Sequence, residues 1–420
     1  MLQKVSLSVK DIDKYGLILE HDMLDEVKAL AADLKGLRLC HINSTPFGGG
    51  VAELLSSLIP MARGVGIAAD WQVIRGDRRF FTITKSLHNA LQGKAYPLIE
   101  KESTQRVYKS NNLENAKELD LDYDVFIVND PQPAALRHFC GSCNAAWIWR
   151  CHVDSSQPDE ATWHFLSPYI EEYDAVVFTM EEFVPPNLKP QLYSHRLPRI
   201  AIMAPAIDPL STKNMAFPPT LWREMLENLD IDKGRPLVSQ ISRFDPWKDP
   251  FGVILSYRLA KEEVPGLQLA LITSFAGDDP EAWDIYAAVH DEVKDDPDVH
   301  IFSNLTGVGN MEVNAFQTAS AVVIQKSIRE GFGLVVSEAL WKGTPVVAGN
   351  TGGIPMQMAG NLQSYLVNSP EECAEKMAYL LKHPDIAHEL GQEGMEHIRR
   401  HFLTPRLLRD ELALIRSLLS

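Results

Sequence analysis

The sequence predicts an α/β protein made of two doubly wound domains, each with a parallel sheet covered by helices. Short apolar segments alternate with segments of helical periodicity along most of the chain, which is the pattern of βα units. Two glycine-rich loops, at residues 48–50 and 331–333, each follow an apolar segment and precede a helix. Residues 204–214 are rich in proline and small side chains, so we expect the linker between the domains there.

Five segments of the N-terminal half have the composition of buried parallel strands, and helical segments separate most of them. The strands are expected at residues 37–42, 69–75, 122–130, 145–154 and 175–179. Two of them change from apolar to polar residues at the carboxyl end, which is where open α/β sheets bind ligands. Asp130 and His152 lie at these two ends and are candidate site residues. For His152, a buried structural histidine is the alternative.

A short helix expected within residues 79–93 carries a cluster of polar side chains. The cluster consists of Thr84, Lys85, His88 and Asn89. These groups could face a sugar, whose hydroxyls need both donors and acceptors. The alternative is a solvated surface helix that packs through its phenylalanine and leucine side chains.

The C-terminal half continues the alternation of strand and helix with greater regularity. Strands are expected at residues 235–242, 267–273, 298–303, 321–324, 344–349 and 365–368. Asp249 and Pro250 predict a helix start, because aspartate caps helix N-termini and proline suits the first helical position. Three more helices are expected after residue 368, and the last begins at a Thr-Pro pair.

The segment 321–343 predicts a strand, a polar loop that contains the glycines of 331–333, and a helix. Glycines there let the backbone approach a ligand, and amides at the start of a helix favour an anion such as phosphate. Glu330 and Glu338 bracket the loop at a spacing of eight residues, which returns to nearly the same helix face. Both carboxylates can accept hydrogen bonds from a polyhydroxyl ligand. The alternative is that Glu330 caps the helix and Glu338 is a solvated charge.

Arg243 and Lys248 lie in one loop after the first strand of the C-terminal half. A guanidinium fork and an ammonium group in the same loop can bracket a diphosphate and stabilise its charge without a metal ion. The glycine triplet 48–50 precedes a helix and offers a second set of backbone donors. The alternative is that this triplet is only a flexible turn.

Composition excludes several classes of partner and predicts a cytoplasmic protein. The chain has 56 Asp and Glu against 40 Lys and Arg, and its net charge of −16 disfavours nucleic acid or an anionic membrane as the main partner. No apolar run is long enough to span a membrane, and the N-terminus lacks the hydrophobic core of a signal peptide. The five cysteines are expected to be reduced thiols. A zinc or redox role for Cys140 and Cys143, which form a lone C-x-x-C, is the alternative.

Four of these features together resemble the retaining glycosyltransferases of the GT-B fold, family 4. They are strand–GGG–helix, a histidine that closes a later strand, R-x4-K, and E-x7-E around GFG. More narrowly, residues from about 37 to about 400 are similar to the trehalose glycosyltransferring synthases and the trehalose phosphorylases. The segments that carry this similarity are HINSTPFGGGVAELL, TKSLHNALQG, NDPQPAAL, WRCHVD, SRFDPWK, DDPEAW, NAFQTAS and SIREGFGLVVSEALWKG.

The resemblance implies two Rossmann-like domains with a cleft between them. Residues 1–204 would form the acceptor domain, 205–402 the nucleotide-sugar domain, and 403–420 a helix that packs back on the N-terminal domain. The implied reaction is transfer of glucose from ADP-, UDP- or GDP-glucose to the anomeric hydroxyl of glucose, which gives α,α-trehalose with retention, or the reverse. The resemblance implies no cofactor, no metal ion, a homodimer, and small-molecule partners only: nucleoside diphosphate glucose, glucose and trehalose.

The resemblance also implies which residues bind the donor. Arg243 and Lys248 would grip the diphosphate, and Glu338 would bind the ribose hydroxyls. Glu330 would hold the transferred glucose. The distal phosphate and the same glucose would contact the backbone of Gly331, Phe332, Gly333 and Leu334.

In the N-terminal domain, the resemblance implies that Gly49 and Gly50 close over the phosphates. His152 would contact the donor sugar near the reacting carbon, and Asp130 would orient sugar hydroxyls beside it. Asp130, His152 and Glu330 are therefore the predicted catalytic residues.

Two other functions are the alternatives to this prediction. A trehalose phosphorylase uses inorganic phosphate in place of a nucleotide's diphosphate. A sugar-nucleotide-binding regulator without catalysis comes from another class, and the full set of site residues disfavours it.

The sequence departs from the family at residues 359–367, where AGNLQSYLV replaces the usual Asp-Gly-x-x-Gly turn. We therefore expect that turn to be built differently.

Overall fold

The computed structural model describes residues 2–19, 21–189, 197–275 and 282–420. This part of the chain divides into two compact units. Unit 1 contains the described residues up to 205 together with residues 404–420, and unit 2 contains residues 206–275 and 282–403. Residues 278–281 of the DDPEAW motif lie outside the described residues.

The sheet of unit 1 has seven strands in the order β1-β3-β2-β4-β5-β6-β7. All neighbours are parallel except the edge strand β1, which is antiparallel to β3. The strands are β1 Gln3–Lys4, β2 Arg38–Asn43, β3 Ala68–Val73, β4 Val125–Asn129, β5 Ala146–Arg150, β6 Ala175–Phe178 and β7 Arg199–Ile202. The parallel part is the doubly wound arrangement that the strand and helix alternation predicts.

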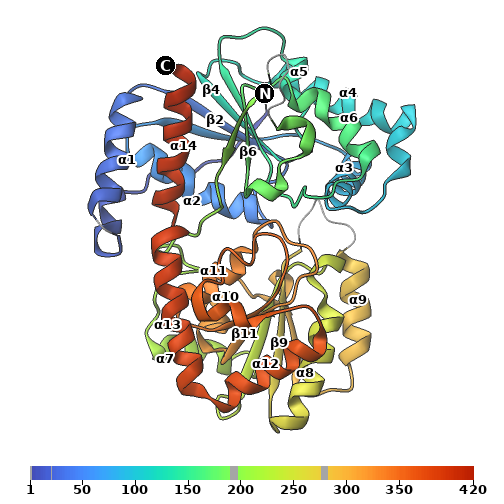
Figure 1. Cartoon of the computed structure of the whole chain (residues 1–420), viewed down its shortest axis with the longest axis vertical. Helices are drawn as coiled ribbons and strands as arrows, with labels where there is room; N and C mark the ends of the chain where they lie inside the picture. Colours follow the sequence, from blue (N-terminus) through green and yellow to red (C-terminus); the bar gives the residue numbers. More distant parts are fainter. Residues whose placement is uncertain (1, 20, 190–196, 276–281) are drawn as a thin grey trace. The chain divides into compact units, whose positions relative to one another are not determined.

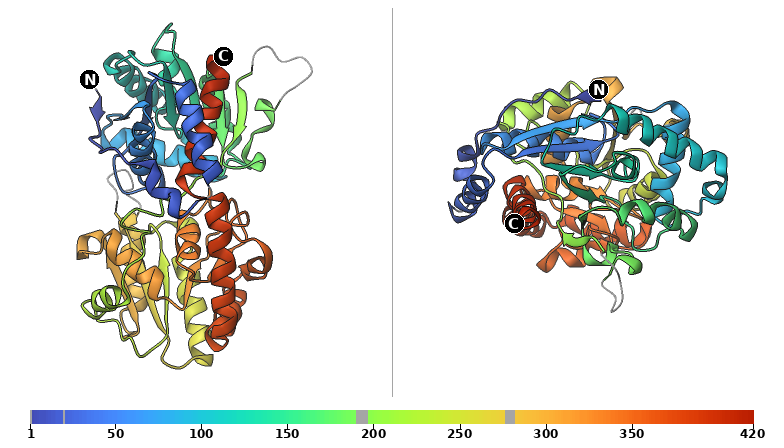
Figure 2. Two further views of the ribbon diagram at one scale, coloured as in Figure 1. Left: turned by 90° about the vertical axis from the view of Figure 1, so that its left-hand side faces the viewer. Right: turned by 90° about the horizontal axis from the view of Figure 1, so that it is seen from above.

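Helices cover both faces of this sheet (Figure 1). Helices α1 (His21–Asp33) and α14 (Thr404–Leu419) pack side by side in every view, and α14 also packs on α2 (Gly50–Gly64) (Figures 1 and 2). The helices of the other face are α3 Arg78–Leu91, α4 Glu102–Glu118, α5 Leu136–Phe139 and α6 Glu160–Ile170. The last seventeen residues of the chain thus belong to the unit formed by the first half of the sequence.

The central strands of unit 1 are buried because both faces of the sheet are covered. In β5, Trp147 and Trp149 join the core cluster that includes α3, α4 and α6, and Trp147 stacks on Phe126 with ring centroids 4.3 Å apart. Side chains alternate between the faces of a strand, so Ile148 and Arg150 lie on the opposite face. That face is therefore not purely apolar.

The sheet of unit 2 has six parallel strands in the order β10-β9-β8-β11-β12-β13. They are β8 Leu237–Ile241, β9 Gln268–Thr273, β10 Val299–Ser303, β11 Val322–Gln325, β12 Val346–Gly349 and β13 Leu366–Val367. The helices of this unit are α7 Pro219–Glu227, α8 Pro250–Glu263, α9 Ala282–Val293, α10 Asn310–Ala319, α11 Leu334–Trp341, α12 Pro370–Lys382 and α13 Pro384–His401. None of the helices in the described chain has the length and apolar character of a membrane span.

Two strands, β1 and β7, and two helices, α5 and α7, were not predicted from the sequence. The two strands lie at the edges of the sheet, where β1 is exposed and β7 is only partly buried. β1 has no apolar run on which a strand prediction could rest. β7 has one, but Pro198 and Pro205 lie on either side of it, so this segment resembled the start of the linker. The predicted cap of α8 is confirmed, because the Asp249 carboxylate accepts a hydrogen bond from the backbone N–H of Gly252 at 3.0 Å.

Candidate active site

In unit 2, the candidate residues lie at the point where the strand order reverses. Strand β8 is central, with β9 and β10 on one side and β11, β12 and β13 on the other. Ligands of doubly wound sheets bind outside the carboxyl ends of the strands at such a point. The loop after β8 contains Arg243 and Lys248, and the loop after β11 contains Glu330 and the glycines of 331–333. The two predicted loops are thus neighbours at one edge.

An ion pair joins these two loops. The Lys248 ammonium contacts the Glu330 carboxylate, and their side chains are 17% and 9% exposed. The same Glu330 oxygen accepts hydrogen bonds from Ser327 Oγ at 3.0 Å and from Gln325 Nε2 at 3.3 Å. Glu330 is therefore fixed by three partners at the end of β11. Arg243 lies at intermediate exposure in the first of the two loops.

The loop that carries Lys248 is held by its own aspartates. The Asp245 carboxylate accepts from the backbone N–H of Trp247 at 2.8 Å, and Gln240 Nε2 donates to the Lys248 carbonyl at 2.8 Å. Asp249 has a left-handed backbone with φ 47°, and its carboxylate caps α8 and also pairs with Lys326. The short sequence RFDPWKD thus builds a rigid turn, because each aspartate replaces a missing backbone acceptor.

Glycine is required at two positions around the loop before α11, one in that loop and one in the neighbouring loop after β12. Gly333 caps α11 with φ 80°, a conformation that few other residues adopt. A Cβ atom at Gly352, in the loop after β12, would overlap the carbonyl oxygen of Glu330. Because Gly333 is the N-cap residue of α11, the alternative that Glu330 caps this helix is wrong. The first amides of α11 therefore have no acceptor within the helix.

Glu338 is fully buried in α11. Its carboxylate pairs with Lys213 Nζ at 2.9 Å and accepts from Gln317 Nε2 at 2.8 Å. Burial acts in the opposite direction, but the ammonium groups of Lys213 and Lys342 and the Gln317 amide hold the pKa of Glu338 below its usual value. The alternative that Glu338 is a solvated helix charge is therefore wrong.

In unit 1, the glycine triplet follows β2, which has β3 on one side and β4 on the other. Gly48 has φ 82°, Gly49 caps α2, and Gly50 is the first residue of that helix. The predicted sequence of strand, glycine loop and helix is confirmed here. The first backbone N–H groups of α2 have no acceptor within the helix, as at the start of α11 in unit 2.

Asp130 and His152 follow the neighbouring strands β4 and β5 and contact each other. The Asp130 carboxylate accepts a hydrogen bond from the backbone N–H of His152 at 2.9 Å. Asp130 itself has φ 66°, which is uncommon outside glycine and asparagine, and its N–H donates to the Arg150 carbonyl at 2.8 Å. Its own carbonyl accepts from Trp149 Nε1 at 3.0 Å. A strained residue held by several bonds is typical of functional sites.

The tautomer of His152 follows from Asn129. Asn129 Nδ2 donates to the carbonyls of Ile42 at 3.1 Å and Ile127 at 3.3 Å, so its oxygen faces His152 Nε2 at 3.0 Å. Burial, together with the charges of Arg150 and His41, holds the pKa of His152 well below its usual value. A neutral imidazole with its proton on Nε2 carries its lone pair on Nδ1. His152 is thus an acceptor at Nδ1 and not an acid.

Five residues that hold the candidate side chains were not identified from the sequence. They are Asn129, Lys213, Gln317, Gln325 and Ser327. Asn129 directly precedes Asp130 at the end of β4. Lys213 and Gln317 lie far from Glu338 along the chain, so no local pattern connects them. Gln325 and Ser327 could have been found, since two polar residues directly after a buried strand are a ligand-edge signal.

The polar cluster of α3 is not solvated as the alternative expected. Thr84 and Asn89 are buried, and Lys85 and His88 are partly buried. That this cluster faces a sugar stays a prediction.

The turn at 359–367 is built around a 3-10 helix, Gly360–Tyr365. Asn361 donates to the Glu393 carboxylate through its backbone N–H at 3.0 Å and through Nδ2 at 3.1 Å. A glutamate of α13 thus supplies an acid at this turn.

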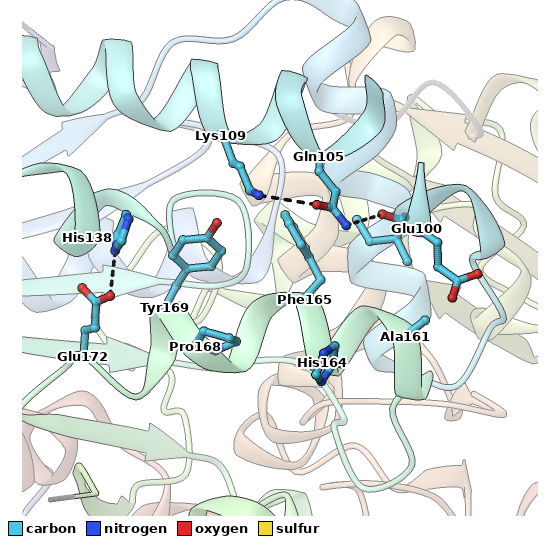
Figure 3. Close-up of a pocket in the computed structure, with 11 residues that line it drawn as sticks. Glu100, Gln105, Lys109, His138, Ala161, His164, Phe165, Pro168, Tyr169 and Glu172 are labelled. Carbon is cyan, nitrogen blue, oxygen red and sulfur yellow. Dashed lines mark hydrogen bonds and ion pairs between the residues drawn. The ribbon is translucent and has the colours of Figure 1, made fainter. Parts of the chain in front are cut away.

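A groove of about 560 Å³ on unit 1 contains none of the predicted site residues (Figure 3). It is formed by α4, α5, α6 and the 3-10 helix Pro97–Glu100. Its polar groups pair with one another: His138 Nδ1 lies 2.7 Å from Glu172 Oε1, and Lys109 Nζ donates to Gln105 Oε1 at 3.4 Å.

The C-x-x-C motif of Cys140 and Cys143 does not suit redox chemistry, which needs a thiolate. Burial raises the pKa of the Cys140 thiol to about 12.

Comparison with known proteins places these features in a family. The family model described as "Trehalose synthase, N-terminal domain" matches residues 41–185, and "Glycosyl transferases group 1" matches residues 223–397. A trehalose synthase of Rubrobacter xylanophilus is 47% identical to this chain over the full length of both proteins. The chain belongs to the trehalose synthase family of glycosyltransferases. The predicted family resemblance is confirmed.

Other members and relatives of this family differ in how much of each chain matches. A trehalose synthase of Pyrococcus horikoshii is 42% identical, with 99% of each chain covered. A trehalose phosphorylase of Grifola frondosa is 27% identical, covering 93% of this chain but only 58% of the phosphorylase. An α,α-trehalose-phosphate synthase (UDP-forming) of Burkholderia xenovorans has a TM-score of 0.70 at 15% identity, with 91% of this chain and 100% of that chain covered. This likeness confirms the predicted fold, two Rossmann-like units of the GT-B class; the cleft between them stays a prediction.

Proposed function

We propose that this glycosyltransferase makes α,α-trehalose from a nucleoside diphosphate glucose and glucose, with retention at the donor's anomeric carbon, in a reversible reaction. The observation that carries the proposal is the 47% identity to a trehalose synthase over the whole length of both chains. The polar groups at the carboxyl ends of both sheets support it, because they suit a charged leaving group and a polyhydroxyl substrate.

The proposed diphosphate site consists of Arg243, Lys248 and the loop before α11. Lys248 pairs with Glu330. An ammonium group has three donors, so Lys248 can keep Glu330 and also bind a phosphate oxygen. The amides from Gly331 to Leu334 add neutral donors at the start of a helix, where the macrodipole favours an anion. This set is preorganised, so little rearrangement is needed when charge develops.

Glu338 is proposed to bind the ribose hydroxyls. Lys213 and Gln317 use two of the roughly four lone-pair sites of its carboxylate, which leaves the others for hydroxyl donors. Because Glu338 has no exposed surface, Lys213 must move or itself contact the ribose. The pKa of Glu338, held below its usual value, keeps the carboxylate ionised and able to accept.

In unit 1, the proposal gives the sugars a neutral imidazole and a carboxylate as partners. His152 would accept a hydrogen bond from a hydroxyl of the donor glucose through Nδ1, and Asp130 would orient hydroxyls beside it. Gly49 and Gly50 would supply amides to the phosphates. A neutral His152 that accepts at Nδ1 suits a carbohydrate hydroxyl. It is not the acid that protonates the leaving group, because its imidazole is not charged.

The proposed chemistry has the acceptor approach the face that the phosphate leaves. The bond from the anomeric carbon to the phosphate oxygen breaks with its electron pair on that oxygen. The acceptor hydroxyl forms the new bond to carbon and passes its proton to the departing phosphate oxygen. Arg243 and Lys248 stabilise the charge that develops on this oxygen, which is where most of the rate enhancement would arise.

Product analysis tests the proposal directly. The purified chain is incubated with glucose and ADP-, UDP- or GDP-glucose, and the products are identified by NMR. We expect α,α-trehalose and the free nucleoside diphosphate with at least one donor. A parallel incubation of trehalose with inorganic phosphate, or with ADP or UDP, separates a synthase from a phosphorylase. Nucleotide binding without transfer in any arm would instead indicate a regulator and would contradict the proposal.

The proposal includes the organisation of the protein in the cell. Residues 1–204 would be the acceptor domain, 205–402 the nucleotide-sugar domain, and 403–420 the returning helix. We propose a cytoplasmic homodimer that acts only on small molecules and needs no metal ion or other cofactor. Sedimentation of the purified chain, with activity measured before and after chelation, checks the assembly and the metal independence.

A further inference from the structure

Helix α14 places one carboxylate inside unit 1. Glu411 is 2% exposed, and its Oε1 lies 3.2 Å from His41 Nε2 while its Oε2 lies 3.6 Å from Arg150 Nη1. His41 and Arg150 are 1% and 3% exposed, so all three groups are shielded from water. Charged groups are rarely buried unless they are paired.

The two partners of Glu411 belong to the strands that carry the candidate site. His41 is in β2, which leads to the glycine loop, and Arg150 is the last residue of β5, two positions before His152. Strand β4, which ends next to Asp130, lies between β2 and β5. The Arg150 carbonyl accepts the N–H of Asp130 at 2.8 Å. One carboxylate thus connects the two strands that flank β4.

The contact of Glu411 with Arg150 is electrostatic as well as steric. Burial lowers the pKa of Arg150 to about 10, and the Glu411 carboxylate is the largest opposing influence. If Glu411 lost its charge, a buried guanidinium would remain without its main counter-ion, and such groups move or admit water. Arg150 accepts the N–H of Asp130 through its carbonyl and lies two positions before His152. A movement of Arg150 would therefore displace Asp130 and His152.

We propose that Glu411 is a positioning residue: the C-terminal helix uses its carboxylate to fix the carboxyl ends of β2 and β5, and with them Asp130 and His152. The helix does not need this residue for attachment. Leu407, Leu408, Leu412 and Ile415 of α14 are fully buried, so an apolar residue at 411 would anchor the helix as well. A carboxylate is needed only to balance His41 and Arg150.

The primary test measures backbone hydrogen exchange and does not depend on any activity. In Glu411→Gln, which keeps the size but not the charge, we expect the amides of Asp130 and His152 to exchange about tenfold faster or more. Asp33→Asn is the control, because it removes a carboxylate that pairs with α14 through Arg416 at 2.8 Å, on the exposed surface. Amides of unit 2, such as Ile328, should be unchanged in both variants. Unchanged exchange at Asp130 and His152 in Glu411→Gln would overturn the proposal.

A double variant keeps the test decisive if Glu411→Gln does not fold. Glu411→Leu combined with Arg150→Met removes both charges and is expected to fold, since apolar replacement of a buried pair is often tolerated. We expect α14 to stay docked while Asp130 and His152 still exchange faster than in the wild type. Wild-type exchange rates in this double variant would show that packing alone positions the strand ends, and the proposal would be wrong.

The activity arm rests on the proposed function. Glu411→Gln should lower kcat for trehalose formation about tenfold to a hundredfold, the effect of a small displacement of site residues, with the Kd for the nucleoside diphosphate unchanged. Glu411→Asp, which keeps the charge, should recover part of this loss. If the wild-type chain makes no trehalose, the proposed function fails, and hydrogen exchange still decides the role of Glu411. An unchanged kcat in Glu411→Gln, with an active wild type, counts against the proposal.

Discussion

The two units have doubly wound sheets, yet the carboxyl ends of these sheets differ in their chemistry. In unit 2, two buried carboxylates are paired with lysines, Glu330 with Lys248 and Glu338 with Lys213. In unit 1, the side chains at the edge are a neutral histidine and a strained aspartate held by backbone hydrogen bonds. The same architecture therefore carries ammonium–carboxylate pairs in one unit, and a neutral imidazole beside a carboxylate held by backbone hydrogen bonds in the other.

This difference suggests how the work is divided between the sheets. Fixed ammonium groups near helix amides suit a diphosphate, whose charge must be stabilised as it leaves. Neutral donors and acceptors suit sugar hydroxyls, which need orientation and not charge. Substitutions that remove charge from the candidate site residues themselves should therefore have large effects in unit 2 and small effects in unit 1.

The largest expected effect comes from breaking the Lys248 and Glu330 pair. Lys248→Ala or Glu330→Ala should lower kcat about a hundredfold to a thousandfold, because a charge-stabilising donor or its holder is lost. Steady-state kinetics of trehalose formation measure this, with circular dichroism to confirm folding. Lys261→Ala is the control, since Lys261 pairs with Asp296 and Asp298 on the same unit.

A double variant sharpens the same comparison. Lys248→Ala with Glu330→Ala leaves no uncompensated charge, so its free energy of unfolding should exceed that of the worse single variant. Its activity should remain as low as that of the single variants. Recovery of activity together with stability would mean that the pair is structural and that the proposed diphosphate site is wrong.

A smaller effect is expected from Glu338→Gln. The amide keeps the size of the side chain but loses the ion pair with Lys213, so the Kd for a nucleoside diphosphate should rise about tenfold with kcat nearly unchanged. Isothermal titration calorimetry measures the Kd, and Glu371→Gln on the exposed start of α12 is the control. An unchanged Kd would remove Glu338 from the ribose site.

His152 should make unit 1 sensitive to acid. Its pKa is lowered in the folded chain, so below about pH 6.5 the unfolded state binds a proton that the folded state does not. Folding stability from this residue therefore falls as pH falls through 6.5, by up to about 1.4 kcal/mol per pH unit. Urea unfolding between pH 7.5 and pH 5.5 (about one unit either side of that value) should show a smaller loss in His152→Gln than in the wild type. The exposed His164 gives the control variant His164→Gln, which should behave like the wild type.

The smallest effect is expected at Asp130. Asparagine tolerates positive φ and keeps an acceptor for the His152 N–H, so Asp130→Asn should change the free energy of unfolding by less than about 0.5 kcal/mol. Asp130→Ala loses both properties and should cost about 1–3 kcal/mol. Urea unfolding distinguishes the two. A large loss in Asp130→Asn would show that unit 1 also depends on fixed charge and would weaken the contrast between the units.

Much of the fold was predictable because its signals are local. Buried parallel strands appear as short apolar runs, and the helix starts are marked by glycine, by Asp249 and Pro250, or by Thr404 and Pro405. The edge strand β1 was missed because it is short and exposed, and β7 because the prolines around its apolar run resemble the start of the linker. In the candidate site, the sequence indicated the carboxylates and cations but not their partners.

The sequence by itself determined which residues follow strands and precede helices, since alternation, glycine and capping act within a few residues. Only the tertiary structure decided which charges neutralise one another. Lys213 reaches Glu338, and Glu411 reaches His41 across 370 positions, because the sheet order and the return of α14 bring those side chains together. Such pairs depend on packing and solvent exclusion, and neither is encoded in any local pattern.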